Sequence, residues 1–139
     1  MKALILAAGV SRRLYPHTYD MPKCLLQVNS KPIIHYQLEA LQKIGVKEII
    51  IIVGYHREML IQNVKKNFPD IIFNFIVNHH YFETNTAYSV FLAKKYLDSD
   101  YLLMNADVVY PKELLLDIYK SNFTNVLAVD VKICGKEEV

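Results

Sequence analysis

Compact runs of apolar residues recur along the chain, at intervals that suit an alternation of strands and helices. The stretch at 48–53 reads Glu-Ile-Ile-Ile-Ile-Val. A continuous β-branched run of this kind is typical of a strand buried on both faces of a parallel sheet. Similar runs predict the remaining strands. The predicted strands cover 2–6, 25–28, 48–53, 71–77, 101–106 and 126–133.

Between these runs, apolar residues recur every three or four positions, which is the spacing of one helical face. Pro32 opens the first helical segment, where its missing N–H costs nothing, and Gly45 ends it as a C-cap glycine would. The apolar face of this segment consists of Ile34, Leu38, Leu41 and Ile44. Three more helices are predicted: one that ends before Pro69, one that begins at Asn85 or Thr86, and one that runs from Pro111 to about Tyr119.

Repeated strand–helix units predict an α/β fold, because consecutive parallel strands need a crossover connection between them. We expect a Rossmann-like three-layer sandwich, with a mainly parallel sheet and helices on both faces. No linker or repeat interrupts the pattern, so residues 1–139 form one predicted domain, a length that suits a single core. No helical pattern follows the last predicted strand, and we therefore expect a truncated domain.

Composition and charge narrow the function classes. Hydrophobic residues make up 53% of the chain, which excludes disorder, and 16 basic against 14 acidic residues give no basic stripe for nucleic acid. No apolar run approaches the roughly 18 residues of a membrane span, so no membrane partner is expected. Cys24 and Cys134 lie far apart and form no C-x-x-C pair, and we interpret them as reduced thiols of a cytoplasmic protein.

The turn after the first predicted strand is the first candidate for chemistry, because ligands bind at the carboxyl ends of such strands. Small residues over 7–9 would let backbone N–H groups approach a ligand closely, and Arg12, Arg13 and Lys23 could neutralise a triphosphate. Neither the dinucleotide motif G-x-G-x-x-G nor the P-loop motif is present. From these residues alone, a tight turn with surface arginines remains the alternative.

The stretch 6–18 reads Leu-Ala-Ala-Gly-Val-Ser-Arg-Arg-Leu-Tyr-Pro-His-Thr and is followed by Pro22-Lys23. It resembles the signature L-A-A-G-x-G-[ST]-R-[LM]-x-P-x-T-x-x-x-P-K of the sugar-phosphate nucleotidyltransferases. This family includes sugar-1-phosphate pyrophosphorylases and bacterial phosphocholine cytidylyltransferases. The sequence departs from the signature at Ser11, where the family has its second glycine, and at Arg12, where the family has a small hydroxyl residue. These departures favour a cytidylyl-type relative.

The resemblance implies a role for each matched residue. The nucleotide-binding segment would be Leu6, Ala7, Ala8, Gly9, Val10, Ser11 and Arg12, with the first four holding base and ribose through backbone groups. Arg13 and Lys23 would be catalytic: Arg13 would bind the triphosphate, and Lys23 would contact the α-phosphate and the phosphate of the second substrate. Asp107 would be a ligand of Mg²⁺, although an Asp that caps the helix beginning near Pro111 is the alternative.

Base recognition is implied for the loop after the third predicted strand. Asn78, Thr84 and Asn85 are the candidates, because an amide offers both a donor and an acceptor to a base edge. The segment 85–89 resembles the cytidylyltransferase branch, which favours CTP. Capping of the third helix by Asn85 or Thr86 is an equally good interpretation.

The function implied is transfer of a nucleotidyl group from a nucleoside triphosphate to a phosphorylated small molecule, such as a sugar-1-phosphate or phosphocholine, with release of pyrophosphate. Catalytic domains of this family are longer than 139 residues, so we expect a fragment or a reduced relative whose second metal carboxylate lies elsewhere. Two alternatives stay open: a nucleotide-binding module without turnover, and an interaction domain with an exposed sheet edge. A homo-oligomer is also compatible with the sequence.

Overall fold

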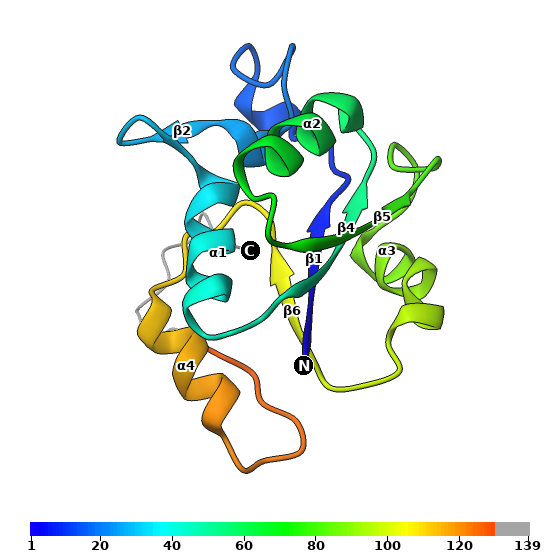
Figure 1. Ribbon diagram of the computed structural model, residues 1–139. Helices are drawn as coiled ribbons and strands as arrows, with labels where there is room; N and C mark the ends of the chain where they lie inside the picture. The colour runs from blue at the N-terminus through cyan, green and yellow to red at the C-terminus, as the bar shows by residue number, and fades with distance from the viewer. Residues whose placement is uncertain (130–139) are drawn as a thin grey trace.

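The computed structural model describes residues 1–129, and its centre is a four-stranded parallel sheet (Figure 1). The strands lie in the order β5-β4-β1-β6. Their bounds are β1 Lys2–Ala7, β4 Glu48–Val53, β5 Ile72–Val77 and β6 Tyr101–Asn105. In register, Leu4 of β1 pairs with Ile50 of β4 and with Leu103 of β6. The predicted parallel α/β sheet is confirmed.

Helices cover both faces of the sheet, as predicted. One face packs against α1 (Ile33–Lys43), α2 (Arg57–Asn67) and α4 (Lys112–Lys120), and the other packs against α3 (Thr86–Leu92). In β4, Ile49 and Ile51 belong to the first core and Ile50 and Ile52 to the second, all of them fully buried. The uninterrupted isoleucine run therefore serves two cores at once, which is why it lacks the alternation of a half-exposed strand.

Short elements connect these layers. They are the 3₁₀ helices η1 (Arg12–Leu14), η2 (Lys23–Leu25) and η3 (Lys94–Tyr96), and a small antiparallel hairpin of β2 (Gln27–Val28) and β3 (Lys31–Pro32). Gly45 has a φ of +84°, so the predicted C-cap glycine of α1 is confirmed. Within residues 1–129, no helix is long and apolar enough to cross a membrane.

Three predicted elements differ from the structure. The strand predicted over 25–28 is limited to Gln27–Val28, because Leu25 closes a 3₁₀ turn instead. The third helix, whose predicted apolar face consists of Val90, Ala93 and Leu97, ends at Leu92. The strand predicted over 126–133 is wrong for residues 126–129, which form no strand, and 130–133 lie outside the described residues. Leu127 is 83% exposed, and an apolar run forms a strand only where a neighbouring strand accepts its backbone hydrogen bonds.

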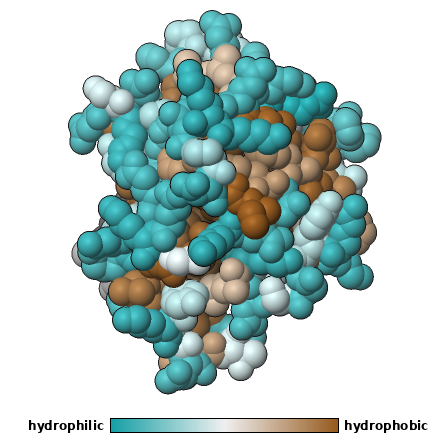
Figure 2. Space-filling model, in the orientation of Figure 1, coloured by the Kyte–Doolittle hydropathy of each residue, from teal (hydrophilic) through white to brown (hydrophobic). Residues whose placement is uncertain are grey.

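The sheet has one apolar edge at β5. Figure 2 shows brown, apolar residues gathered along this strand, on a face that is otherwise mostly polar. Ile72 is 63% exposed, and Phe73 and Phe75 stack with their ring centroids 5.6 Å apart. This edge lies at the opposite side of the sheet from β6.

Candidate functional site

A cavity of about 410 Å³ opens at the carboxyl ends of β1 and β6. The strand order reverses here, because the chain builds outward from β1 through β4 to β5 and then adds β6 on the other side of β1. Ligands of open α/β sheets bind at such a switch point. Three segments line the cavity: the turn after β1, the loop 78–89, and η2 together with the end of β6.

The turn after β1 forms one wall from small residues. The lining residues of this turn are Leu6, Ala7, Ala8, Gly9 and Ser11. A Cβ atom placed on Gly9 would meet no atom within 4 Å. Packing within the protein therefore does not require a glycine here, and the missing side chain leaves this part of the cavity free for a ligand.

A different glycine is needed to hold this wall in place. A Cβ atom on Gly54, just after β4, would lie 2.8 Å from the backbone oxygen of Ala8 and 2.9 Å from Cβ of Tyr81. The next residue, Tyr55, donates its N–H to the same Ala8 oxygen at 3.2 Å. The close approach of the two turns thus depends on Gly54.

Ser11 adopts the left-handed conformation, with φ of 57°. The hydroxyl of Thr18, which is fully buried, donates to the backbone oxygen of Ser11 at 3.1 Å. A glycine adopts this conformation without the steric cost that a Cβ atom carries, which gives a physical reason for a glycine at this position of the signature. The serine is held in the same conformation by the buried threonine.

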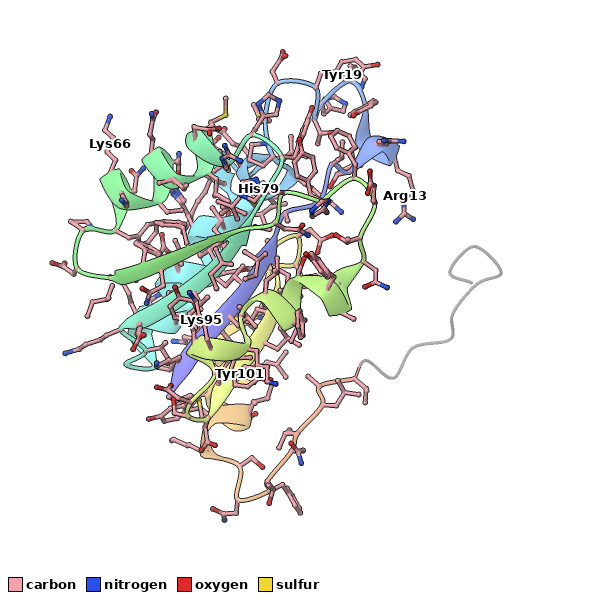
Figure 3. The ribbon with its side chains drawn as sticks, turned by 90° about the vertical axis from the view of Figure 1, so that its right-hand side faces the viewer. Arg13, Tyr19, Lys66, His79, Lys95 and Tyr101 are labelled. Carbon is pink, nitrogen blue, oxygen red and sulfur yellow. The ribbon has the colours of Figure 1, made fainter. Side chains whose placement is uncertain are left out.

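Two residues of the predicted nucleotide-binding segment, Val10 and Arg12, and the predicted catalytic residue Arg13 do not line the cavity. Val10 is buried in the protein. The guanidinium of Arg12 lies over the ring of Phe82, 5.5 Å from its centroid. Arg13 is exposed on η1, and Figure 3 shows its side chain directed outward from the loop. In this structure, therefore, neither arginine lines the cavity.

Lys23 and Asp107 meet in the cavity although 84 residues separate them. The Lys23 Nζ donates to Asp107 Oδ2 at 2.7 Å, and both side chains stay partly exposed, at 32% and 42%. Lys23 begins η2, and Asp107 follows the end of β6. The structure thus brings Lys23, which was predicted to bind phosphate, next to Asp107, which was predicted to bind the metal.

Gln37 of α1 holds the loop that carries Asp107 by hydrogen bonds to its backbone. The sequence analysis did not identify Gln37 as a residue of the site. Gln37 is fully buried, and its Nε2 donates to the backbone oxygens of Asn105 at 2.7 Å and Val108 at 2.5 Å. A signal was available in the sequence, since Gln37 lies on the apolar face that also contains Ile34 and Leu41. A polar residue in such a face indicates a specific buried partner.

Asn78 lines the cavity, but its amide is used within the loop. Its Nδ2 donates to the hydroxyl oxygens of Thr84 at 2.9 Å and Ser89 at 3.3 Å, and its Oδ1 accepts the N–H of His80 at 2.9 Å. Thr84 in turn donates its hydroxyl to the backbone oxygen of His80 at 2.7 Å. These bonds brace the loop 78–89, so Asn78 and Thr84 shape the wall of the cavity.

Asn85 both caps a helix and lines the cavity. Its Oδ1 accepts the N–H of Tyr88 at 3.2 Å, which is the capping role considered from the sequence. Within the described part of the chain, no hydrogen bond uses its Nδ2, and the residue is exposed. The amide therefore presents a donor at the cavity wall while its acceptor stays engaged.

The match to known proteins agrees with this arrangement. A family model described as nucleotidyl transferase matches residues 2–128. The chain belongs to the nucleotidyl transferase family. The matched range contains every residue that lines the cavity.

Relatives of this nucleotidyl transferase chain include two bacterial cytidylyltransferases. It is 38% identical over 130 residues to a choline-phosphate cytidylyltransferase of Streptococcus pneumoniae, covering 94% of this chain and 55% of the relative. It is 33% identical over 140 residues to a CTP:phosphoglutamine cytidylyltransferase of Campylobacter jejuni, covering 96% and 54%. The chain spans about half the length of these curated relatives.

A solved structure supports the fold assignment. The structure of a CTP:phosphocholine cytidylyltransferase from Streptococcus pneumoniae is similar with a TM-score of 0.67 and 40% identity. The match covers 76% of this chain and 44% of that one. The Rossmann-like fold predicted from the sequence is therefore confirmed for this nucleotidyl transferase.

The oxygen ligands that the cavity offers suit a hard cation that takes its remaining ligands from water and substrate. Over residues 1–129, no group of three His, Cys, Asp or Glu side chains could enclose a metal ion. Mg²⁺ needs no such cage, since it takes one or two carboxylates and fills its other positions with water and substrate phosphates. Asp107 supplies one carboxylate. Burial raises the pKa of the neighbouring Cys24 thiol to about 12, so the thiol is protonated at neutral pH.

Proposed function

We propose that this chain is the nucleotide-binding part of a nucleotidyltransferase that transfers a nucleotidyl group, with CTP favoured, to a phosphorylated small molecule and releases pyrophosphate. The observation that carries the proposal is the Lys23–Asp107 pair, 2.7 Å apart beside the small-residue turn at the switch point of the sheet. It places a cation for phosphate oxygens next to a carboxylate for a phosphate-bound cation.

The reaction needs little acid–base chemistry from the protein. An oxygen of the acceptor's phosphate attacks the α-phosphorus of the nucleotide, and a new P–O bond forms. The bond from the α-phosphorus to the oxygen leading to the β-phosphate breaks, and pyrophosphate leaves. The nucleophile is already anionic, so catalysis rests on positioning and on charge neutralisation.

The residues divide this work between them. The turn Leu6 to Gly9 would receive the nucleoside against backbone groups, since Gly9 leaves open space there. Lys23 would hold the α-phosphate and the acceptor's phosphate, and Arg13 would contact the triphosphate from the loop that carries η1. Asp107 would hold Mg²⁺, which supplies charge neutralisation for the phosphates when bound.

CTP is the favoured nucleotide on two grounds. The two relatives named above are cytidylyltransferases by name. Asn85, whose Oδ1 is engaged in capping α3, would present its Nδ2 donor to the base. N3 of cytosine is an acceptor, whereas N3 of uracil carries a proton, so a donor that faces N3 favours cytosine over uracil. Phosphocholine and other small phosphate monoesters are the acceptors to test, in a cytoplasmic setting where nucleoside triphosphates and such acceptors occur.

A pyrophosphate-release assay tests the proposal. CTP, UTP, GTP and TTP would each be offered with Mg²⁺ and with phosphocholine, phosphoglutamine or a sugar-1-phosphate. Release with CTP above that with the other nucleotides is the expected result. Absence of release with every pair would contradict catalysis by this polypeptide. Calorimetric titration with CTP and Mg²⁺ would then distinguish the second candidate, a nucleotide-binding module without turnover, which is favoured by the single carboxylate found in the described part of the cavity.

A further inference from the structure

Helix α1 sends one polar side chain into an otherwise apolar interface. Its other buried residues include Ile34, Leu38 and Leu41, whereas Gln37 reaches the backbone on both sides of Asp107. The two acceptors are the oxygens of Asn105 and Val108, which are 68 and 71 residues away in the sequence. One amide group thus clamps the four-residue segment that carries the carboxylate.

The orientation of this amide is fixed by its partners. Carbonyl oxygens accept hydrogen bonds, so only the NH₂ end of Gln37 can face the oxygens of Asn105 and Val108. Its Oε1 is buried and has no partner within residues 1–129. An unpaired buried acceptor is unfavourable, so an apolar residue would serve better if the position only filled space. The donor end therefore has a specific task, which is to hold the loop.

The same helix is also joined to the other half of the ion pair. The N–H of Ile33, the first residue of α1, donates to the backbone oxygen of Leu26 at 3.0 Å, directly after η2 and its Lys23. One turn further along, Gln37 holds the loop of Asp107. A single rigid element thus sets the separation between Lys23 and Asp107.

We propose that Gln37 is a positioning residue for the metal–nucleotide complex: it fixes the Asp107 carboxylate against Lys23 by clamping the backbone on both sides of it. This inference rests on the proposed function, because it assigns Gln37 to the same site.

The test measures how strongly Mg²⁺ tightens CTP binding, by calorimetry in Mg²⁺ and in EDTA. Gln37→Met keeps the length of the side chain and removes its donors. Gln37→Asn keeps the amide but shortens its reach, and it serves if the first variant does not fold. Leu41→Val is the matched control, since it changes a fully buried residue of the same helix and leaves the clamp intact.

Each Gln37 variant is expected to lose about tenfold of the Mg²⁺-dependent gain in CTP affinity, as partners of metal ligands typically do when replaced. CTP affinity in EDTA is expected to stay close to that of the original chain. The control is expected to keep the full gain, although circular dichroism will show it less stable to heat. A folded Gln37 variant with an unchanged gain would overturn the inference alone. No CTP binding by the original chain in either condition would overturn the proposed function, and this inference with it.

Discussion

Lys23 Nζ lies 2.7 Å from Asp107 Oδ2, in a pair that two unrelated segments of the chain bring to the switch point of the sheet. Both side chains are partly exposed, and an ion pair of this kind contributes at most about 1 kcal/mol to stability. The pair therefore contributes little to folding and suits binding better. Lys23 can exchange Asp107 for a phosphate, and Asp107 can exchange Lys23 for a cation.

Replacement of Asp107 by Asn should separate these two roles. The proposed metal ligand is lost, so the gain in CTP affinity on adding Mg²⁺ should fall by more than the roughly tenfold expected for an outer partner. The free energy of unfolding should change by less than about 1 kcal/mol. Calorimetry and urea denaturation measure the two quantities.

A matched ion pair provides the control for this variant. Lys31 Nζ lies 2.6 Å from Glu39 Oε2, with side-chain exposures of 32% and 40% against 32% and 42% in the Lys23–Asp107 pair. Glu39→Gln removes the same kind of contact away from the cavity and should leave the effect of Mg²⁺ intact. Equal effects of Mg²⁺ in Asp107→Asn and Glu39→Gln would contradict the metal role of Asp107.

Loss of either proposed phosphate-binding cation should weaken triphosphate binding. A hydrogen bond to a charged group contributes about 1.5–3 kcal/mol, so Lys23→Ala and Arg13→Ala should each raise the dissociation constant of CTP by roughly ten- to a hundredfold. Lys66 points away from the body of the protein on α2, and Lys66→Ala is the control for a change in net charge (Figure 3). Unchanged affinity in both of the first two variants would remove the phosphate assignment.

The prediction for Arg13→Ala requires more than the prediction for Lys23→Ala. Its side chain is exposed and lies outside the cavity in the structure. Contact with a triphosphate therefore requires the loop to rearrange around the nucleotide. If Lys23→Ala weakens binding while Arg13→Ala does not, the cavity keeps its cation from η2 and the loop arginine is a surface residue, as one interpretation of the sequence allowed.

The sequence was sufficient for the four strands of the parallel sheet and for the edge of that sheet that carries the site. The isoleucines of 48–53 predicted a strand buried on two faces, and Ile49 and Ile50 indeed belong to different cores. The carboxyl end of 2–6 predicted the turn where a ligand would bind, and the cavity indeed opens there. These predictions succeed because burial on both faces and strand direction are recorded in local patterns.

What the sequence could not give depends on partners far along the chain. The hydrogen bonds of Gln37 link residues 68 and 71 positions apart, and no local pattern specifies them. Asn78 is used within its own loop, which only the folded positions of Thr84 and Ser89 decide. The apolar run at 126–129 failed to predict a strand for a related reason, since a strand needs a neighbouring strand as well as a sequence pattern.

Gly9, which lines the cavity, and Gly54, which holds the cavity wall in place, should respond differently to replacement by alanine. Gly9→Ala adds a methyl group where no atom lies within 4 Å, so the free energy of unfolding should stay within about 1 kcal/mol of the original. CTP affinity should fall, because the methyl group is added to a residue that lines the cavity proposed for the nucleoside. Gly54→Ala places its Cβ 2.8 Å from the Ala8 oxygen and should destabilise the chain by about 1–3 kcal/mol.

Urea denaturation and CTP titration on both glycine variants check this contrast. A Gly9→Ala chain that is as stable as the original and binds CTP equally well would show that the nucleoside lies elsewhere. A Gly54→Ala chain of unchanged stability would show that the turns after β1 and β4 can separate without cost.

Cys24 should make the stability of the chain fall in alkaline solution. Burial raises the pKa of its thiol from the ordinary 9.0 to about 12, so above pH 9 the unfolded chain releases a proton that the folded chain keeps. Folding stability from this group is therefore complete below pH 9 and is lost as the pH rises toward 12, with about 1.4 kcal/mol lost by pH 10. The measurement is urea denaturation at pH 8 and pH 10, in a Cys134→Ser background that leaves Cys24 as the only thiol. Cys24→Ala in the same background removes this loss while the lysines and tyrosines titrate as before, and an equal pH dependence in both chains would show that the thiol ionises in the folded state.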